Sequence, residues 1–553
     1  MLILFSFALF MSAALLFFVE PMFARMILPL LGGAPAVWNT CVVFYQTLLF
    51  GGYLYAHMLS SRLRVRQQWL VHTALFVVAL VMLPLAVGPS SAPPSTANPV
   101  GWVFQLLVMG VSLPFFALAA TGPLLQRWFG TLGHRASANP YMLYAASNLG
   151  SLLALLAYPM LVEPAMRLRT QSIAWTGLYL VLIIIVSVCG YAAAQVVSGR
   201  PAGSAQGAEP GAQNSWNLRL RWLTLAAVPS TLMLSVTTFI SVDVAAVPLL
   251  WMVPLALYLL TFVFAFSDRQ LISPGLVARL FPGACVIVVA LVLAQNAFPI
   301  VTTVTWHLLA FFIVALACHQ GLAATRPAPE RLTEFYLWLS AGGVVGGLFN
   351  TLVAPQIFVN PIEYPLAAIS ACLLLPGAAF AGLSAGRRVL RGASALAPAA
   401  LLAALIFAVR LLDDRLPQSV VVRYLFIFLI PLLGCYALRR RPLLMGVALA
   451  AVLIEGSLVR FDNRVPLYVE RTFFGIHKVM STGEERLLVS GTTNHGAQAV
   501  DVNLKCEPLT YYSREGPVGQ LFASLAGQPH RTRFGVVGLG TGSIGAYATP
   551  GED

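Results

Sequence analysis

A glycine-rich turn near the end of the sequence has the residue types and spacing of a cofactor-binding loop. Gly538, Gly540 and Gly542 follow a short apolar run at 534–537, and a helix-forming stretch begins at Ser543. This is the order of the first strand, turn and helix in nucleotide-binding α/β domains. Glycines let such a turn bend tightly and let its backbone approach a ligand closely. We therefore expect these three glycines to bind a cofactor.

A second set of candidates is charged or ionisable and lies in or beside apolar segments. Glu20 and Arg25 occur at the end of the first apolar segment, and Asp243 lies near the end of a later one. Charged groups in lipid are costly and usually functional, so all three are candidates for the transport of a solute or an ion. The alternative is that they lie at the water interface without a special role. His307 and His319, in one apolar segment, have the same two interpretations.

The composition is that of a membrane protein. Of the 553 residues, 59% are hydrophobic and 10% are charged, and the mean hydropathy is +0.82, which is too apolar for a soluble protein. The net charge of +13 comes from short arginine clusters between apolar segments, which is typical of cytoplasmic loops and not of a nucleic-acid surface. We expect a multi-pass protein of a bacterial inner (plasma) membrane, with the lipid bilayer as partner and no nucleic acid. The seven scattered cysteines indicate neither a metal site nor a disulfide framework.

Apolar segments long enough to cross a bilayer predict two sets of six membrane helices. The first set lies at 1–19, 36–58, 68–88, 101–126, 141–162 and 172–196, and the second at 220–240, 246–266, 276–296, 303–324, 333–354 and 364–384. The predicted domains are a first six-helix half (1–197), a Gly/Ala/Ser/Gln/Pro-rich linker (198–219), a second half (220–384), extra membrane helices (385–458) and a tail (459–553). Two halves around a flexible linker are the layout of a major-facilitator-like transporter.

Three further apolar stretches leave the side of the tail open. They lie at about 394–409, 419–438 and 443–457. With a cytoplasmic N-terminus, three crossings would put the tail outside and two would leave it in the cytoplasm. The tail itself alternates short apolar runs with charges, which predicts strands and turns.

The two predicted halves contain a short internal sequence repeat, which we call the echo. The triplets Pro35, Trp38, Tyr45 and Pro248, Trp251, Tyr258 share one spacing at the start of the second helix of their halves, and Ser147/Gly150 and Ser340/Gly343 form a weaker pair. A match of three residues can arise by chance, but it favours duplication with parallel halves. The run 342–347, with four glycines, follows no strand, so we interpret it as a helix-packing surface.

Three segments before the glycine turn resemble the spermidine synthase family. In chain order they are 470–479, 486–498 and 509–519. The chain resembles more closely the membrane-bound branch of that family, in which a transporter-like helical domain is joined to a spermidine-synthase-like domain. The resemblance covers the tail in its motifs and the helical part in its layout. The fold it implies is mostly α: a bundle of twelve membrane helices plus two or three more, then a small β segment and the start of a Rossmann-like α/β domain.

The resemblance also implies a cofactor site. The family binds decarboxylated S-adenosylmethionine as co-substrate, related enzymes use S-adenosylmethionine, and neither needs a metal. Gly538, Gly540 and Gly542 match the cofactor loop. The family's ribose-binding acid and catalytic Asp come after that loop. We therefore expect them beyond Asp553, with only the N-terminal part of the domain in this sequence, and assign no catalytic residue.

Four residues match or replace groups that line the family's amine pocket. Tyr511 matches the Tyr of a Tyr-His pair, and Tyr512 replaces the His. Asn494 stands for a nearby Gln, and His495 adjoins it, whereas Ser490 replaces an Asp at the end of the preceding strand. These changes leave the identity of the amine open. The structural alternative for the tyrosines and His495 is that they are half-buried strand or loop residues.

Two functions fit the sequence. The first is a membrane-bound aminopropyl transferase, or a related S-adenosylmethionine-type transferase, that acts on a small amine in polyamine metabolism. The alternative is a multi-pass transporter of polyamine-like or other small solutes, whose synthase-like tail is regulatory or vestigial.

Overall fold

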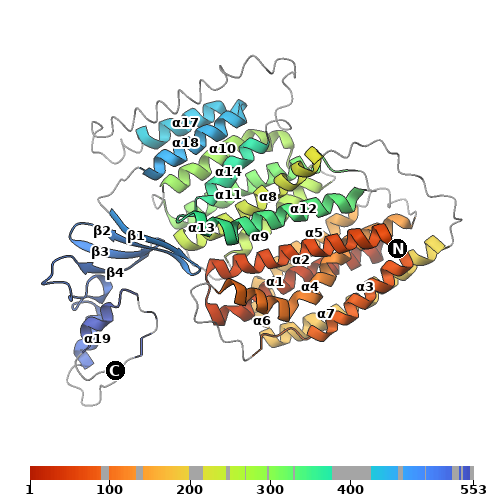
Figure 1. Cartoon of the computed structure of the whole chain (residues 1–553), viewed down its shortest axis with the longest axis horizontal. Helices are drawn as coiled ribbons and strands as arrows, with labels where there is room; N and C mark the ends of the chain where they lie inside the picture. The colour runs from red at the N-terminus through yellow and green to blue at the C-terminus, as the bar shows by residue number, and fades with distance from the viewer. Residues whose placement is uncertain are drawn as a thin grey trace.

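The structure is a computed structural model of a long helix bundle with a small β-sheet at one end (Figure 1). It describes residues 1–88, 99–132, 141–198, 216–244, 250–267, 270–294, 298–327, 331–375, 425–458, 465–491, 493–525, 535–536, 538 and 540–548. The predicted helix at 394–409 and most of the linker at 198–219 lie outside these residues.

Two groups of helices make up most of the bundle. The N-terminal helices are α1 (Leu2–Leu31), α2 (Pro35–Arg62), α3 (Val65–Ala79), α4 (Val100–Thr131), α5 (Tyr141–Ala157), α6 (Glu163–Ala165) and α7 (Leu168–Ser198). The C-terminal helices are α8 (Trp216–Phe239), α9 (Met252–Phe266), α10 (Pro274–Ala294), α11 (Ile300–Ala323), α12 (Leu332–Leu348), α13 (Ala354–Ile357) and α14 (Glu363–Leu374). Two more helices, α17 (Ile430–Ala437) and α18 (Pro442–Leu458), pack beside α10 and α14.

The helices have the length and surface that a bilayer requires. Nine helical spans in the described part of the chain are long and apolar enough to cross a membrane. Many large apolar side chains on the outer helices are exposed, among them Val78, Val81, Met160 and Ile184. Continuous helices satisfy their backbone groups internally, as lipid demands. These features identify a multi-pass integral membrane protein in contact with lipid.

The two groups meet through reciprocal helix pairs. The second helix of the N-terminal group, α2, packs against the fifth of the C-terminal group, α12, and α5 packs against α9 in the same way. The echo residues Trp38 and Trp251 meet at this boundary, where their rings stack with centroids 3.3 Å apart. In addition, α5 and α12 both pass through a π-turn, at Tyr158–Val162 and Phe349–Val353, into a short helix. This pairing supports the internal duplication.

The glycines at 342–347 serve close helix packing, as predicted. A Cβ atom on Gly342 would collide with the Leu223 carbonyl oxygen of α8, and one on Gly346 would lie 2.5 Å from the Ala227 carbonyl oxygen. Small residues at such a crossing let two helix backbones approach each other. Gly343, on another face of α12, would meet nothing within 4 Å.

Two predicted boundaries were wrong. The first helix does not end at residue 19 but continues to Leu31 with Pro21 and Pro29 inside it, because the sequence after Pro21 stays apolar and packs within the bundle. The linker does not extend to residue 219, because α8 begins at Trp216. There Trp216 packs edge-on against Trp338, 6.0 Å between ring centroids, and Arg219 pairs with Glu334 at 2.8 Å.

The described tail contains a four-stranded antiparallel sheet. Its strands β1 (Val465–Thr472), β2 (Gly475–Ser481), β3 (Glu485–Ser490) and β4 (Thr493–Ala499) follow one another in the order β1-β2-β3-β4. Tight turns join them, and Gly483 takes the positive φ of 95° that the β2–β3 turn needs. The strands and turns predicted for the tail are therefore present. The short helix α19 (Pro517–Leu525) follows the sheet.

The sheet lies at the end of the bundle opposite the N-terminus (Figure 1). We call this the sheet end. One cavity there is surrounded by residues from the starts of α2 and α4, the end of α8, the π-turn Phe349–Val353, α13 and the strands β1 and β2. At the opposite end, Phe5 packs against Phe129, and His57 of α2 contacts Thr333 of α12. Successive helices therefore run in opposite directions between the two ends of the bundle, as helices that cross a membrane do.

Candidate functional site

A buried ion pair fastens the sheet to the helix bundle. Arg471 of β1 donates from Nη2 to Glu363 Oε1 at 2.7 Å and from Nη1 to Glu363 Oε2 at 3.2 Å. Arg471 Nη1 also donates to the Phe358 carbonyl oxygen at 3.2 Å. The side chains are only 8% and 1% exposed, respectively. Next to this pair, Phe473 at the turn of the β1–β2 hairpin is buried in the hydrophobic core of the helices. The hairpin is thus part of the membrane domain's packing.

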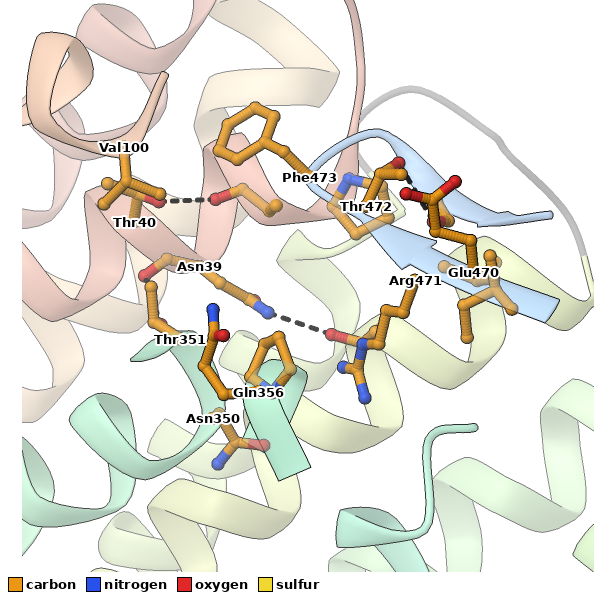
Figure 2. A pocket seen from close by; sticks show the side chains of 17 residues that line it. Asn39, Thr40, Val100, Asn350, Thr351, Gln356, Glu470, Arg471, Thr472 and Phe473 are labelled. Carbon is orange, nitrogen blue, oxygen red and sulfur yellow. Dashed lines mark hydrogen bonds between the residues drawn. The ribbon is translucent and has the colours of Figure 1, made fainter. Parts of the chain in front are cut away.

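Beneath the hairpin lies a cavity of about 280 Å³, which we call the outer cavity. Figure 2 shows its side chains, which come from both helix groups and from the hairpin. The polar residues are Asn39 and Thr40 of α2, Thr238 of α8, Asn350 and Thr351 of the π-turn after α12, Gln356 of α13, and Glu470, Arg471 and Thr472 of β1. Asn39 Nδ2 donates to Thr238 Oγ1 at 2.9 Å across the boundary between the groups. The outer cavity is therefore shared by three parts of the molecule.

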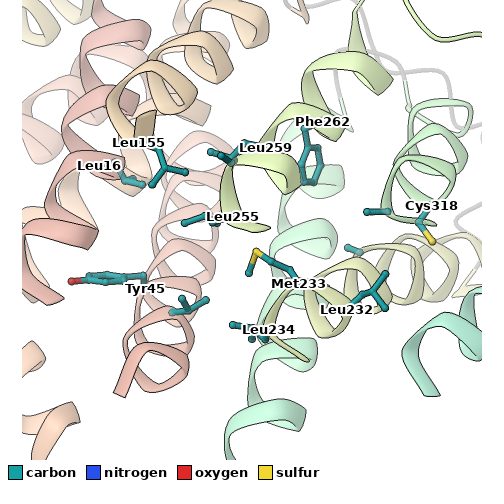
Figure 3. Close-up of a cluster of buried hydrophobic side chains, with 14 of the residues drawn as sticks. Leu16, Tyr45, Leu155, Leu232, Met233, Leu234, Leu255, Leu259, Phe262 and Cys318 are labelled. Atoms are coloured by element: carbon teal, nitrogen blue, oxygen red, sulfur yellow. The ribbon is translucent and has the colours of Figure 1, made fainter. Parts of the chain in front are cut away.

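A second cavity, of about 180 Å³, lies deeper in the boundary, and we call it the central cavity. Leu16 and Tyr45 of the N-terminal helices and Leu255 and Met233 of the C-terminal helices contribute to its apolar wall (Figure 3). Glu20 also lines it and is 7% exposed. Among the described residues, no cation and no hydrogen-bond donor pairs with the Glu20 carboxylate. A carboxylate in such a place is costly unless a ligand or a proton compensates it.

The duplicated residues surround the central cavity. Tyr45 and its echo Tyr258 both line it, as do Ser147 and Ser340. The Tyr45 hydroxyl is buried without a partner in the described part of the chain. Equivalent residues of the two groups thus face one space at the boundary.

The other two charged candidates have different surroundings. Arg25 lies inside α1 and pairs with Glu163 at 2.5 Å, the two side chains being 34% and 24% exposed. It lines a shallow depression at the sheet end and not the central cavity. Asp243 lies in the π-turn Ile240–Val244, and its side chain is outside the described atoms. The water-interface interpretation thus suits Arg25, whereas Glu20 lies inside the bundle.

The two candidate histidines of α11 are buried against hydroxyl groups. His307 Nδ1 lies 3.0 Å from the Tyr364 hydroxyl oxygen, and His319 Nδ1 lies 2.7 Å from Thr261 Oγ1. Neither histidine lines the central or the outer cavity. These contacts favour the structural interpretation of both.

In the tail, the structure brings the predicted amine-pocket residues close to the glycine turn. The Tyr511 hydroxyl donates to the His495 carbonyl oxygen at 2.9 Å, and the Tyr511 and Tyr512 rings lie 4.4 Å apart. A Cβ on Gly540 would lie 3.2 Å from the Tyr512 hydroxyl oxygen and 3.6 Å from the His495 carbonyl oxygen. The Tyr512 hydroxyl beside it raises the pKa of Tyr511. Asn494 uses its Oδ1 to accept from the Gly496 amide at 3.0 Å and thus shapes β4.

The three glycines of the turn have backbone angles in the left-handed region. Gly538, Gly540 and Gly542 have positive φ angles of 85°, 56° and 72°, which favour glycine. A Cβ on Gly538 would meet no atom of the described residues within 4 Å. A short 3-10 helix, Ser543–Tyr547, follows in place of the expected α-helix start. Residues 535–536 are in neither a strand nor a helix, so the opening Rossmann strand stays a prediction.

Sequence reasoning missed the residues that join the parts. Glu163 and Glu363 lie at helix starts near prolines, and no sequence pattern pairs them with Arg25 and Arg471. Asn39 and Asn350 are single amides in apolar segments, which sequence alone does not distinguish from packing residues. The rarity of acids in the helical part is the signal that could have singled out the two glutamates.

The described residues contain no group of three or more His, Cys, Asp or Glu that could hold a metal ion. Comparison of the sequence with models of known protein families finds no match, and comparison with curated proteins finds none either.

Proposed function

We propose that the helical part is a transporter of a small cationic solute and that Glu20 is its charge-binding residue. The observation that carries this proposal is the Glu20 carboxylate, 7% exposed, beside a cavity between two helix groups. Intramembrane acids that face a cavity commonly handle substrates or protons. The reciprocal contacts of α2 with α12 and of α5 with α9 support a major-facilitator-like arrangement, in which two halves rock around a central site.

The distribution of arginines supports an orientation for this transporter. Helix ends at the N-terminal end of the bundle carry Arg62, Arg64, Arg66, Arg127, Arg219, Arg221, Arg326 and Arg331, whereas the sheet end of the helices carries Arg25, Arg167 and Arg169. Cytoplasmic loops are enriched in arginine and lysine. The proposal therefore puts the N-terminus in the cytoplasm and the sheet outside, in a bacterial inner membrane.

The test is uptake by proteoliposomes that contain the full chain. We expect radiolabelled spermidine or putrescine to enter faster than into empty liposomes, and Glu20→Gln to lower the initial rate at least tenfold, because an amide cannot neutralise a cation. Glu484→Gln, on the exposed tail, is the matched control and should retain the rate. Uptake that is absent, or that is unchanged in Glu20→Gln, would contradict the proposal.

A second function is proposed for the tail: a spermidine-synthase-like aminopropyl transferase that uses decarboxylated S-adenosylmethionine. The closeness of Tyr511, Tyr512 and His495 to Gly540 favours it. The co-substrate would supply a carbon activated by its sulfonium group. The glycine turn would present open backbone to it, and the two tyrosines would position a small amine beside it. The four antiparallel strands would correspond to the family's small β-domain.

Two measurements test this second function. Calorimetry with decarboxylated S-adenosylmethionine should detect micromolar binding to protein purified from its native membrane. The same protein should form methylthioadenosine from that compound and putrescine. Failure to form it would remove the transferase proposal and leave the transporter proposal intact.

A further inference from the structure

The two cavities follow one another along the boundary between the helix groups. On α2, which begins at the sheet end, Asn39 lines the outer cavity and Tyr45, further along the helix, lines the central cavity. On α8, which ends at the sheet end, Met233 lines the central cavity and Thr238 lines the outer one. The outer cavity therefore lies between the central cavity and the sheet end, on the route by which a solute would enter from that side.

Contacts between the helix groups close this route at the level of the outer cavity. Asn39 of α2 donates to Thr238 of α8 at 2.9 Å, and the Asn39 carbonyl oxygen accepts from Thr351 at 3.3 Å. Beside Asn39, the Trp38 ring stacks on the Trp251 ring of the other group. An opening toward the sheet end would have to break these contacts and separate the start of α2 from the end of α8 and from the π-turn after α12.

The β1–β2 hairpin spans this boundary. The hydrogen bonds of the Arg471 side chain described above go to Glu363 and to the Phe358 carbonyl oxygen, which anchors the hairpin to the C-terminal group. From that anchor the hairpin extends over the outer cavity, and Figure 2 shows Phe473 on the side where Val100 of the N-terminal group lies. Phe473 is 9% exposed and belongs to the hydrophobic core of the helices. The hairpin is thus fixed to one helix group and packed toward the other.

The turn of the hairpin holds two neighbouring phenylalanines in different surroundings. Thr472 and Gly475 pair across the turn, where the Thr472 hydroxyl donates to the Gly475 carbonyl oxygen at 3.2 Å and accepts from the Phe474 amide at 3.2 Å. These bonds make the turn compact. Phe473 packs into the helices, whereas Phe474 is 50% exposed. The packing of the turn on the helices therefore depends on Phe473.

We propose that the β1–β2 hairpin is a strap that holds the two helix groups together at the sheet end and closes the central cavity on that side. For the route to open, Phe473 must leave the N-terminal group while Arg471 keeps the hairpin on the C-terminal group. A cover of this kind shields a site from water and sets how often the site opens. The tail thereby regulates access to Glu20. This regulatory role rests on the proposed transport function, whereas the closure of the outer cavity does not.

The test measures how fast a thiol in the outer cavity reacts, which requires no transport. Thr40 lines the outer cavity and is 0% exposed, and its hydroxyl donates to the Ala36 carbonyl oxygen of its own helix. Thr40→Cys therefore introduces a thiol without removing a contact between the helix groups. The full chain also carries Cys41→Ser and Cys506→Ser, which remove the neighbouring thiol and the exposed one. A cationic methanethiosulfonate reagent is added to this protein in detergent, and mass spectrometry follows the labelling of position 40.

The two phenylalanines of the turn supply the comparison. We expect Phe473→Ala to raise the labelling rate at position 40 at least tenfold, because the strap then loses its packing on the helices. Phe474→Ala, in the same turn, is the matched control and should leave the rate unchanged. Cys285 of α10 is 0% exposed and reports a general loss of the fold in the same molecules.

Each outcome decides the proposal. Faster labelling of position 40 in Phe473→Ala, with Cys285 unlabelled, supports the strap. An unchanged rate in Phe473→Ala would overturn it, as would an equal rise in Phe474→Ala. A parallel rise at Cys285 would also overturn it, because the hairpin would then keep the whole bundle folded. Absence of spermidine uptake by proteoliposomes would contradict the proposed transport function, but it would not change these labelling rates.

Discussion

The central cavity and the junction with the sheet each contain a buried glutamate, but the two glutamates differ in what surrounds them. Glu20 at the central cavity has no partner in the described part of the chain, whereas Glu363 at the junction accepts two hydrogen bonds from Arg471. Both are almost completely shielded from solvent, at 7% and 1% exposure. Burial alone therefore does not separate the carboxylate that we propose to bind a solute from the one that holds the sheet.

The difference lies in whether the protein itself supplies the compensating charge. Glu363 is satisfied by the chain, so its contribution is to hold the hairpin on the helices. No described residue compensates the charge of Glu20, and under the proposed transport function a solute or a proton does so. A third glutamate, Glu163, is paired with Arg25 and is 24% exposed. The three form a series in which the expected effect of a mutation on stability differs in size and in sign.

The largest expected effect on stability follows from Arg471→Ala. Removal of one partner of a buried pair leaves the other charge buried and uncompensated, which costs about 3–5 kcal/mol. We expect the melting temperature of the full chain to fall and limited proteolysis to cut the tail faster.

Two further variants locate the cause of this loss. Glu363→Gln in the Arg471→Ala background removes the orphaned charge and should recover part of the stability. Arg514→Ala breaks the exposed pair with Glu507, with side chains 56% and 40% exposed, and should leave the melting temperature unchanged. If Arg471→Ala behaves like Arg514→Ala, the ion pair does not hold the sheet on the bundle.

The sequence predicts much of the helix bundle because lipid imposes a simple rule on it. Long apolar segments must form helices, so the helix regions and the close packing at 342–347 could be read directly. Helix ends are harder, since Pro21 signals a stop in water but is tolerated in a packed membrane helix. The extension of α1 to Leu31 turned Glu20 from a residue at a helix end into one inside the bundle.

The candidate sites are less predictable because they depend on distant contacts. Glu363 and Arg471 are 108 residues apart in sequence, and Asn39 meets Thr238 across the two helix groups. No local pattern marks such pairs. The echo of Trp38 in Trp251 is the exception, since a repeated spacing pointed to two residues that stack at the boundary. In the tail, the order of the motifs led to residues that the structure places near one another, while their role stays a prediction.

The second expected effect has the opposite sign. Glu20→Leu replaces an uncompensated carboxylate by an apolar group of similar size, so the free energy of unfolding should rise by about 1–3 kcal/mol, even though transport should be lost. Chemical denaturation in detergent measures the first quantity and proteoliposome uptake the second.

Glu334→Leu is the matched control for this variant. The Glu334 carboxylate pairs with Arg219 at 2.8 Å and with Arg331 at 2.9 Å, so its loss should destabilise the protein. A stability that falls in both variants would mean that Glu20 has a partner of its own in the folded protein, and the contrast with Glu363 would disappear.

The smallest expected effect belongs to Arg25→Ala, which completes the series. Its pair with Glu163 is partly exposed at the sheet end, where solvent screens both charges and can hydrate the partner that remains. Such pairs contribute about 0–1 kcal/mol, so chemical denaturation should detect little change and spermidine uptake should stay within twofold of the unaltered protein. A large loss of uptake without a loss of stability would assign Arg25 to the transport path. This partly exposed pair would then have the transport role that we propose for Glu20, and solvent exposure could no longer be used to rank the three glutamates.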